Sequence, residues 1–124
     1  MDWKFSDELP IYQQIMDGIK QRIATGEWLP GQKLPAVREL AVDAGVNPNT
    51  MQKALAELER EGLLYTKRTA GRFVTEQKEV TEGLQEEMVR QQVEEFLTGM
   101  KRLGYSISDI IALLQKILEN ERGE

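Results

Sequence analysis

Residues 37–62 read VRELAVDAGVNPNTMQKALAELEREG, and this stretch decides the fold. Apolar side chains recur at helical spacing on both sides of Gly45, a residue type that commonly ends helices. Asn47 and Pro48 then supply a favoured N-cap residue and a favoured first helical residue, and Gly62 terminates the pattern. The stretch therefore predicts two helices joined by a tight turn.

The second of these helices has two chemically different faces. Its apolar side chains recur at the spacing of a buried stripe, at Met51, Ala54, Leu55 and Leu58. The other face carries hydrogen-bonding side chains, at Asn49, Thr50, Gln52 and Lys53. Asn and Gln can pair with adenine through two hydrogen bonds, and Lys can reach guanine or a phosphate. This face therefore predicts contact with base edges in the major groove of DNA.

The residues before this stretch predict one more helix. Isoleucines recur every four residues from Ile11 to Ile23, which is the pattern of an amphipathic helix, and Gly26 ends it. A turn over Trp28–Gly31 and a short extended segment, Lys33–Pro35, then lead to the helix pair.

The residues after the helix pair predict a β-hairpin. Leu63–Lys67 and Arg72–Thr75 read as strands, and Arg68–Gly71 is the turn between them. Cations and a small residue at a hairpin tip suit an approach to phosphates or to a minor groove. Helix, helix, turn, helix and hairpin is the layout of a winged helix-turn-helix, a mainly α fold with a small β-hairpin wing. We predict such a DNA-binding domain at residues 1–76.

Residues 77–124 predict a second region of two helices. A polar linker, Glu76–Glu79, precedes them, and Ser106 with Asp109 resembles a capping box at the start of the last helix. Their apolar stripes are too extensive to leave in water, and a second copy of the chain is the economical partner. We therefore predict a dimerisation region. Its contact residues are Leu84, Met88, Phe96, Leu97, Met100, Ile107, Ile110, Ile111, Leu114, Ile117 and Leu118.

The composition of the 124 residues excludes several classes of site. The chain has no cysteine and no histidine, which excludes disulfides, Cys or His zinc ligands, and catalysis by either residue type. We identify no phosphate loop and no nucleophile–base pair, so we expect no enzyme, no metal and no cofactor. No run is apolar enough to span a bilayer and the first residues do not resemble a signal peptide, so a cytoplasmic location is expected.

Charge is distributed unevenly along the chain, whose formal net charge is -5. Residues 33–75 hold seven bases and five acids, a net charge of +2. Residues 77–124 hold six bases and ten acids, a net charge of -4. We therefore expect the acidic C-terminal region to face away from a phosphate backbone.

Residues 10–74 also match the pattern of a known family. The matching residues are Pro10-Ile11-Tyr12, Gln14-Ile15, Gly26, Pro30-Gly31, Leu34-Pro35, Arg38-Glu39-Leu40-Ala41, Gly45-Val46, Thr50, Ala54, Leu58, Glu61-Gly62-Leu63, Gly71 and Phe73-Val74. With these residues the chain resembles the GntR family of bacterial transcriptional regulators. The short tail and the string from Val46 to Thr50 resemble its YtrA-like subfamily, in which two helices after the wing serve dimerisation.

The resemblance implies DNA contact at three places: Arg38, the start of the second helix of the pair, which corresponds to the recognition helix of the family, and the wing tip. Together with the residue types above, it gives a predicted DNA-binding set of Arg38, Asn47, Asn49, Thr50, Gln52, Lys53, Arg68, Gly71 and Arg72. The chain departs from the family pattern in three ways. Ala36 stands where the family usually has Ser, and the wing reads Thr69-Ala70-Gly71-Arg72 where the family usually has Gly-any-Gly-Thr. Many relatives have arginines where this chain has Pro48 and Gln52, so we expect different base contacts.

These observations predict a homodimeric, sequence-specific regulator that binds an inverted repeat in double-stranded DNA, more often a repressor than an activator. The resemblance implies a transport-related operon and the regulator's own gene as targets. The alternative is a winged-helix module that binds protein without specific DNA binding. A small-molecule effector of unknown identity stays open, although the short tail leaves little room for an enclosed ligand pocket of about 300 Å³ or more.

Three aromatic residues and one acidic cluster have plainer interpretations. We expect Trp3, Tyr12 and Trp28 to pack rather than to bind a ligand. Glu57, Glu59 and Glu61 are expected to form a solvated surface, because they point in different directions on a helix.

Overall fold

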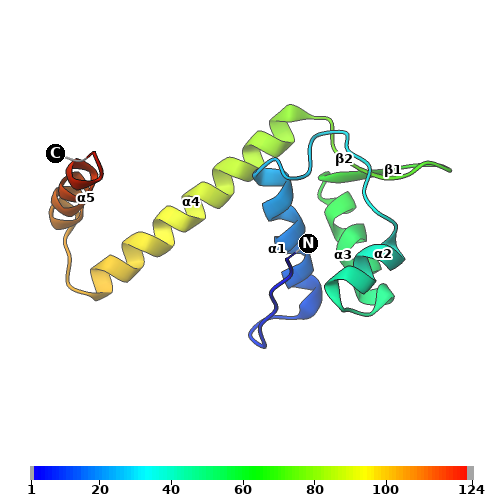
Figure 1. Cartoon of the computed structure of the whole chain (residues 1–124), viewed down its shortest axis with the longest axis horizontal. Coiled ribbons are helices and arrows are strands. Elements are labelled where there is room, and N and C mark those ends of the chain that lie inside the picture. Colours follow the sequence, from blue (N-terminus) through cyan, green and yellow to red (C-terminus); the bar gives the residue numbers. More distant parts are fainter. Residues whose placement is uncertain (1, 123–124) are drawn as a thin grey trace. The chain divides into compact units, whose positions relative to one another are not determined.

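The computed structural model describes residues 2–122, which form five helices and one β-hairpin (Figure 1). The elements are α1 (Ile11–Ala24), α2 (Val37–Ala44), α3 (Pro48–Arg60), β1 (Leu64–Lys67), β2 (Gly71–Val74), α4 (Lys78–Arg102) and α5 (Ile107–Glu121). The predicted fold class, mainly α with a β-hairpin wing, is confirmed. Both strands begin and end within one residue of the predicted bounds. The predicted linker is too long, because α4 already begins at Lys78.

The residues predicted to end α2 and to begin α3 have these roles in the structure. Gly45 ends α2 in the left-handed conformation, with φ +71° and ψ +34°. Asn47 caps α3, since its Oδ1 accepts a hydrogen bond from the Asn49 N–H at 2.7 Å, and Pro48 occupies the first turn. The turn between the helices is therefore fixed by short-range chemistry.

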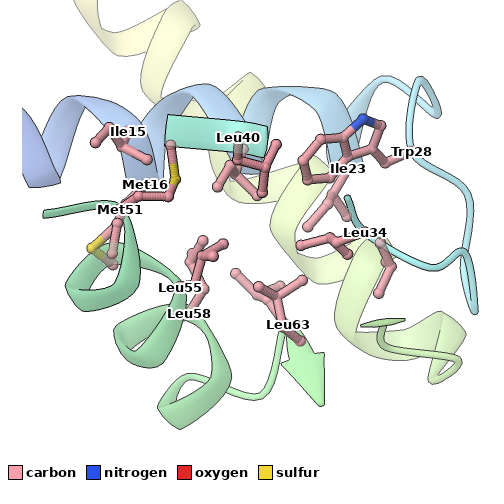
Figure 2. Packing of buried hydrophobic residues seen from close by; sticks show 14 of the residues in the cluster. Ile15, Met16, Ile23, Trp28, Leu34, Leu40, Met51, Leu55, Leu58 and Leu63 are labelled. Atoms are coloured by element: carbon pink, nitrogen blue, oxygen red, sulfur yellow. The ribbon is translucent and has the colours of Figure 1, made fainter. Parts of the chain in front are cut away.

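The main hydrophobic core lies between α1, α2 and α3 (Figure 2). Its largest fully buried side chains from these helices are Ile15, Ile19, Leu40, Met51, Leu55 and Leu58. Trp28 joins them at 6% exposure, so its predicted packing role is confirmed. Because one side of α3 is held in this core, its opposite side is left on the surface.

The hairpin is fastened to the chain segment before α2. β1 and β2 are antiparallel, with Thr66 opposite Arg72. The backbone N–H of Leu34 donates to the carbonyl of Arg72 at 2.9 Å, and Lys33 forms a β-bridge with Phe73. The predicted extended segment thus pairs with the hairpin and ties the wing to the start of α2.

The N-terminal segment packs on α1 and α2 through Trp3. The Trp3 indole N–H donates to Asp43 Oδ2 at 3.0 Å, and the Arg22 guanidinium lies 4.1 Å from the Trp3 ring centroid. Arg22 is buried, and it also donates to the carbonyl of Gly18 at 2.8 Å. The predicted packing role of Trp3 is therefore confirmed.

The chain divides into two compact units, Met1–Glu86 and Glu87–Glu124. The first turns of α4 belong to the first unit because Val80 and Leu84 pack against its core. The sequence places the boundary earlier, at residue 76, and assigns Leu84 to the dimer surface. In the structure Leu84 has apolar neighbours within its own chain.

The second unit exposes most of its apolar side chains. Its last helix, α5, starts with the predicted capping box: the Asp109 N–H donates to Ser106 Oγ at 3.1 Å, and the Ser106 N–H donates to Asp109 Oδ2 at 2.9 Å. The backbone hydrogen bond lowers the pKa of Asp109. Ile110 is buried within the described chain. Several large apolar residues are more than 40% exposed, namely Phe96, Ile107, Ile111, Leu114, Ile117 and Leu118.

None of the helices in residues 2–122 is long and apolar enough to cross a membrane.

Candidate nucleic-acid interface

The exposed face of α3 carries the predicted base-reading side chains. Asn49, Gln52 and Lys53 are exposed, and Thr50 is half-buried. They reach the surface because Met51 and its apolar neighbours one and two turns along occupy the core. The structure therefore places four of the predicted residues on one helix surface.

Lys53 is held from the side of α1. Its Nζ lies 4.0 Å from the ring centroid of Tyr12, a cation–π distance, and Tyr12 itself packs partly buried against the core. Tyr12 therefore has the predicted packing role and also supports a side chain of the α3 surface.

Arg72 lies against α3 from the side of the wing. Its Nε donates to Glu59 Oε1 at 3.2 Å, and its Nη1 makes a longer contact, 3.5 Å, with Gln52 Oε1. The Arg72 side chain is only 17% exposed. The structure thus gives this arginine a carboxylate partner within the domain, where the sequence suggested a cation presented to phosphate.

Glu59 has partners that the sequence does not predict, although its side chain is still 37% exposed. Its Oε1 accepts hydrogen bonds from both Thr66 Oγ1, at 2.6 Å, and Arg72 Nε. Thr66 and Arg72 are directly opposite each other on the two strands. One carboxylate on α3 therefore binds a cross-strand pair of the wing, a contact that helical spacing alone does not reveal.

We predict that this carboxylate makes stability depend on pH. The hydrogen bond from Thr66 is the largest cause of the lowered pKa of Glu59, and Arg72 lowers the pKa further against the opposing effect of burial. A lowered folded-state pKa stabilises the fold above the unfolded-state pKa, near 4.5, and that stabilisation is lost as pH falls through the folded value.

Urea unfolding of the wild type and of Glu59→Gln measures this contribution. We expect the wild type to be more stable at pH 7, and the difference to shrink steadily in titrations below about pH 4.5. A difference in unfolding free energy that is constant from pH 7 to pH 3 would contradict the assignment.

The wing tip carries a free cation and an unusual backbone. Arg68 is exposed and forms no ion pair within the described chain. The Ala70 N–H donates to the Lys67 carbonyl at 3.1 Å, and Thr69 between them has φ +66°. Gly71 has φ +109°, and a Cβ there would lie 3.1 Å from Lys33 Cε. The backbone conformation therefore favours glycine at this position, and a side chain there would also displace the end of the Lys33 side chain.

An open hollow of about 570 Å³ lies between the start of α2 and the hairpin. Lys33, Ala36 and Gly71 are among its lining residues, together with Glu39. Ala36 is the N-cap of α2 and makes no side-chain cap, so the first N–H groups of α2 lack a side-chain acceptor. Arg38 is exposed in the same turn.

The sequence analysis does not include Lys33 in the DNA-binding set, because only the pairing of Lys33 with Phe73 brings this lysine to the wing.

The sequence model of the bacterial regulatory proteins of the gntR family matches residues 11–74, which span α1 to the end of β2. The chain belongs to the GntR family. Its family and its relatives are transcriptional regulators rather than enzymes, and the winged helix-turn-helix is their DNA-binding domain.

Two GntR-type proteins of Bacillus subtilis (strain 168) align with nearly the whole chain. The uncharacterised HTH-type transcriptional regulator YhcF is 40% identical, over 96% of this chain and 98% of its own. The HTH-type transcriptional repressor YtrA is 35% identical, over 92% of this chain and 88% of its own. The similarity to the YtrA-like branch that the sequence predicts is therefore confirmed.

Solved structures of the GntR family share the fold. A GntR family transcriptional regulator from Listeria monocytogenes is 43% identical and has a TM-score of 0.82, covering 90% of this chain and 98% of that one. The AraR DNA-binding domain in complex with operator ORR3 is 36% identical with a TM-score of 0.53, covering 60% of this chain and 90% of that one. A DNA-binding domain similar to part of this chain is therefore bound to operator DNA in that structure.

The wing forms a paired hairpin despite its departure from the GntR pattern. Thr69 stands at the position of the missing glycine, and its backbone still adopts the left-handed conformation. For a residue with a Cβ this conformation costs roughly 1–2 kcal/mol. Gly71, which matches the pattern, stands where a side chain would meet Lys33.

Proposed function

We propose that the chain is a homodimeric transcriptional repressor that binds an inverted repeat. The observation that carries this proposal is the polar surface of α3, flanked by two exposed arginines without carboxylate partners in the described chain, Arg38 and Arg68. A helix surface of this kind suits a major groove, and the flanking cations suit the phosphates on either side.

The residues divide into two roles in this proposal. Asn49, Gln52 and Lys53 contact base edges, with Thr50 beside them. Arg38, Arg68 and the backbone at Gly71 contact phosphates, and the hollow between α2 and the hairpin accepts the DNA backbone near Lys33. Asn47 contributes mainly by capping α3, which fixes where the reading surface begins.

The dimer rests on the exposed apolar side chains of the second unit. In α5, Ile107, Ile111, Leu114 and Leu118 recur at helical spacing and are each at least 42% exposed. A second copy of the chain would cover them, and a two-fold dimer presents two recognition helices to two half-sites. This supports an inverted repeat as the operator.

The repressor role rests on similarity to YtrA, which is named a repressor. The proposed targets, a transport-related operon and the regulator's own gene, rest on the family resemblance described above. No residue in the described chain identifies an effector.

Selection of random duplex DNA by the purified protein, sequenced at two salt concentrations, tests this function. We expect enrichment of one inverted repeat at both salts, with weaker binding at the higher salt because counterion release contributes to affinity. Retention of DNA without any enriched sequence would contradict sequence-specific binding. No retention at low salt would instead favour a winged-helix module that binds protein.

A further inference from the structure

We infer that Arg72 is a positioning residue for base selection: through Glu59 and Gln52 it fixes the wing on α3 and orients the Gln52 amide, and it does not bind a DNA phosphate. This inference rests on the proposed contact between Gln52 and a base. The inference adds Arg72 as a residue that influences which base is selected without contacting the base.

The first support is the shared acceptor. Thr66 Oγ1 and Arg72 Nε reach the same oxygen of Glu59, at 2.6 Å and 3.2 Å, from opposite strands of the hairpin. A two-stranded hairpin is marginally stable by itself. The carboxylate of α3 therefore fixes the position of both strands relative to the recognition helix.

The second support is the burial of Arg72. Its side chain is 17% exposed, whereas Arg68 at the wing tip belongs to the exposed residues and has no ion pair in the described chain. To reach a phosphate, Arg72 would have to leave Glu59, whose carboxylate would then face the anionic DNA without its counter-charge. Arg68 can reach a phosphate without breaking any ion pair.

The third support is the orientation of Gln52. Gln52 and Glu59 are two turns apart on the same side of α3, and the Arg72 guanidinium spans them. Since Arg72 Nη1 donates to Gln52 Oε1, the amide oxygen is directed toward the wing and the amide N–H groups point away from it. Paired reading of adenine needs both the oxygen and an N–H on the base. With its oxygen bound by Arg72, Gln52 offers only N–H groups to a base. We therefore expect it to select a base that presents acceptors and no donor in the major groove, guanine or thymine.

Four variants test the inference on the operator found by selection: Arg72→Gln, Arg72→Lys, Glu59→Gln and the Arg72→Gln/Glu59→Gln double variant. We expect each to shift preference toward adenine at one position of each half-site. Because the two residues act as one unit, the double variant is expected to shift it no further than either single variant. The slope of log affinity against log salt is expected to stay at the wild-type value for Arg72→Gln.

Two further variants separate this inference from its alternatives. Arg68→Gln is the matched charge control, and we expect it to lower the salt slope by about 0.9 while leaving base preference unchanged. Gln52→Ala marks the position that Gln52 reads. Circular dichroism at 25 °C checks that each variant is folded. If Arg72→Gln does not fold, Arg72→Lys, which keeps the positive charge, takes its place in the test.

Each contrary result has a distinct meaning. If Arg72→Gln lowers the salt slope by about 0.9 with unchanged base preference, Arg72 binds a phosphate and the inference is wrong. If Arg72→Lys has the wild-type base preference, a positive charge at this position is enough and the orientation of Gln52 by the guanidinium is not needed, which also overturns the inference. If Gln52→Ala leaves every base preference unchanged, the proposed base contact fails and the inference fails with it.

Discussion

Replacing Ile111 and Leu114 by glutamate is expected to convert the protein to a monomer and to weaken binding to the full operator by about 10²–10⁴-fold. The two side chains are 51% and 42% exposed, so the substitution adds charge to the surface that we assign to the partner copy. The size follows from bivalency, because a monomer binds only one half-site and loses the gain from the tethered second contact.

Sedimentation velocity and titration of full and half operators measure both effects. Affinity for a single half-site is expected to stay near the wild-type value, because the substituted residues belong to the second unit. Gln115→Glu/Asn120→Asp adds the same charge to exposed polar positions of α5 and serves as the control. A dimeric Ile111→Glu/Leu114→Glu variant would place the dimer contact elsewhere.

Short-range chemistry explains which parts of the fold the sequence predicts well. Gly45, Asn47 and Pro48 act through their own backbone and the next few residues, so their effect can be read without a structure. The capping box at Ser106 and Asp109 is of the same kind. The bounds of the helix pair follow directly from these residues.

Contacts between distant segments explain what the sequence leaves open. Spacing identifies apolar stripes but does not say which neighbour covers them. It predicts a dimer surface at Leu84 and Ile110, whereas in the structure Leu84 is partly buried and Ile110 is buried within their own chain. The sequence likewise predicts a DNA contact for Arg72, because nothing in it shows that Glu59, thirteen residues away on another element, is the partner of this arginine. The candidate site could be located from sequence, whereas the pairing within it could not.

Leu58→Ala is expected to lower the free energy of unfolding of the first unit by about 2–5 kcal/mol. Leu58 is fully buried on the side of α3 opposite the reading surface. Figure 2 shows it among core residues of α1 and the segments that flank α3. Truncation removes apolar contact and leaves a cavity, because close-packed neighbours relax only partly.

Urea unfolding followed by circular dichroism, at fixed protein concentration because a dimer links stability to concentration, measures this loss. Val42→Ala is the control: Val42 is 83% exposed on α2, and its truncation is expected to change the unfolding free energy by no more than about 0.5 kcal/mol. If Leu58→Ala costs no more than this control, the core cannot be what holds α3 in place. The core contacts α3 only through the apolar face of this helix, which lies opposite the polar surface. Without that support the polar surface would lack the fixed position that contact with base edges requires.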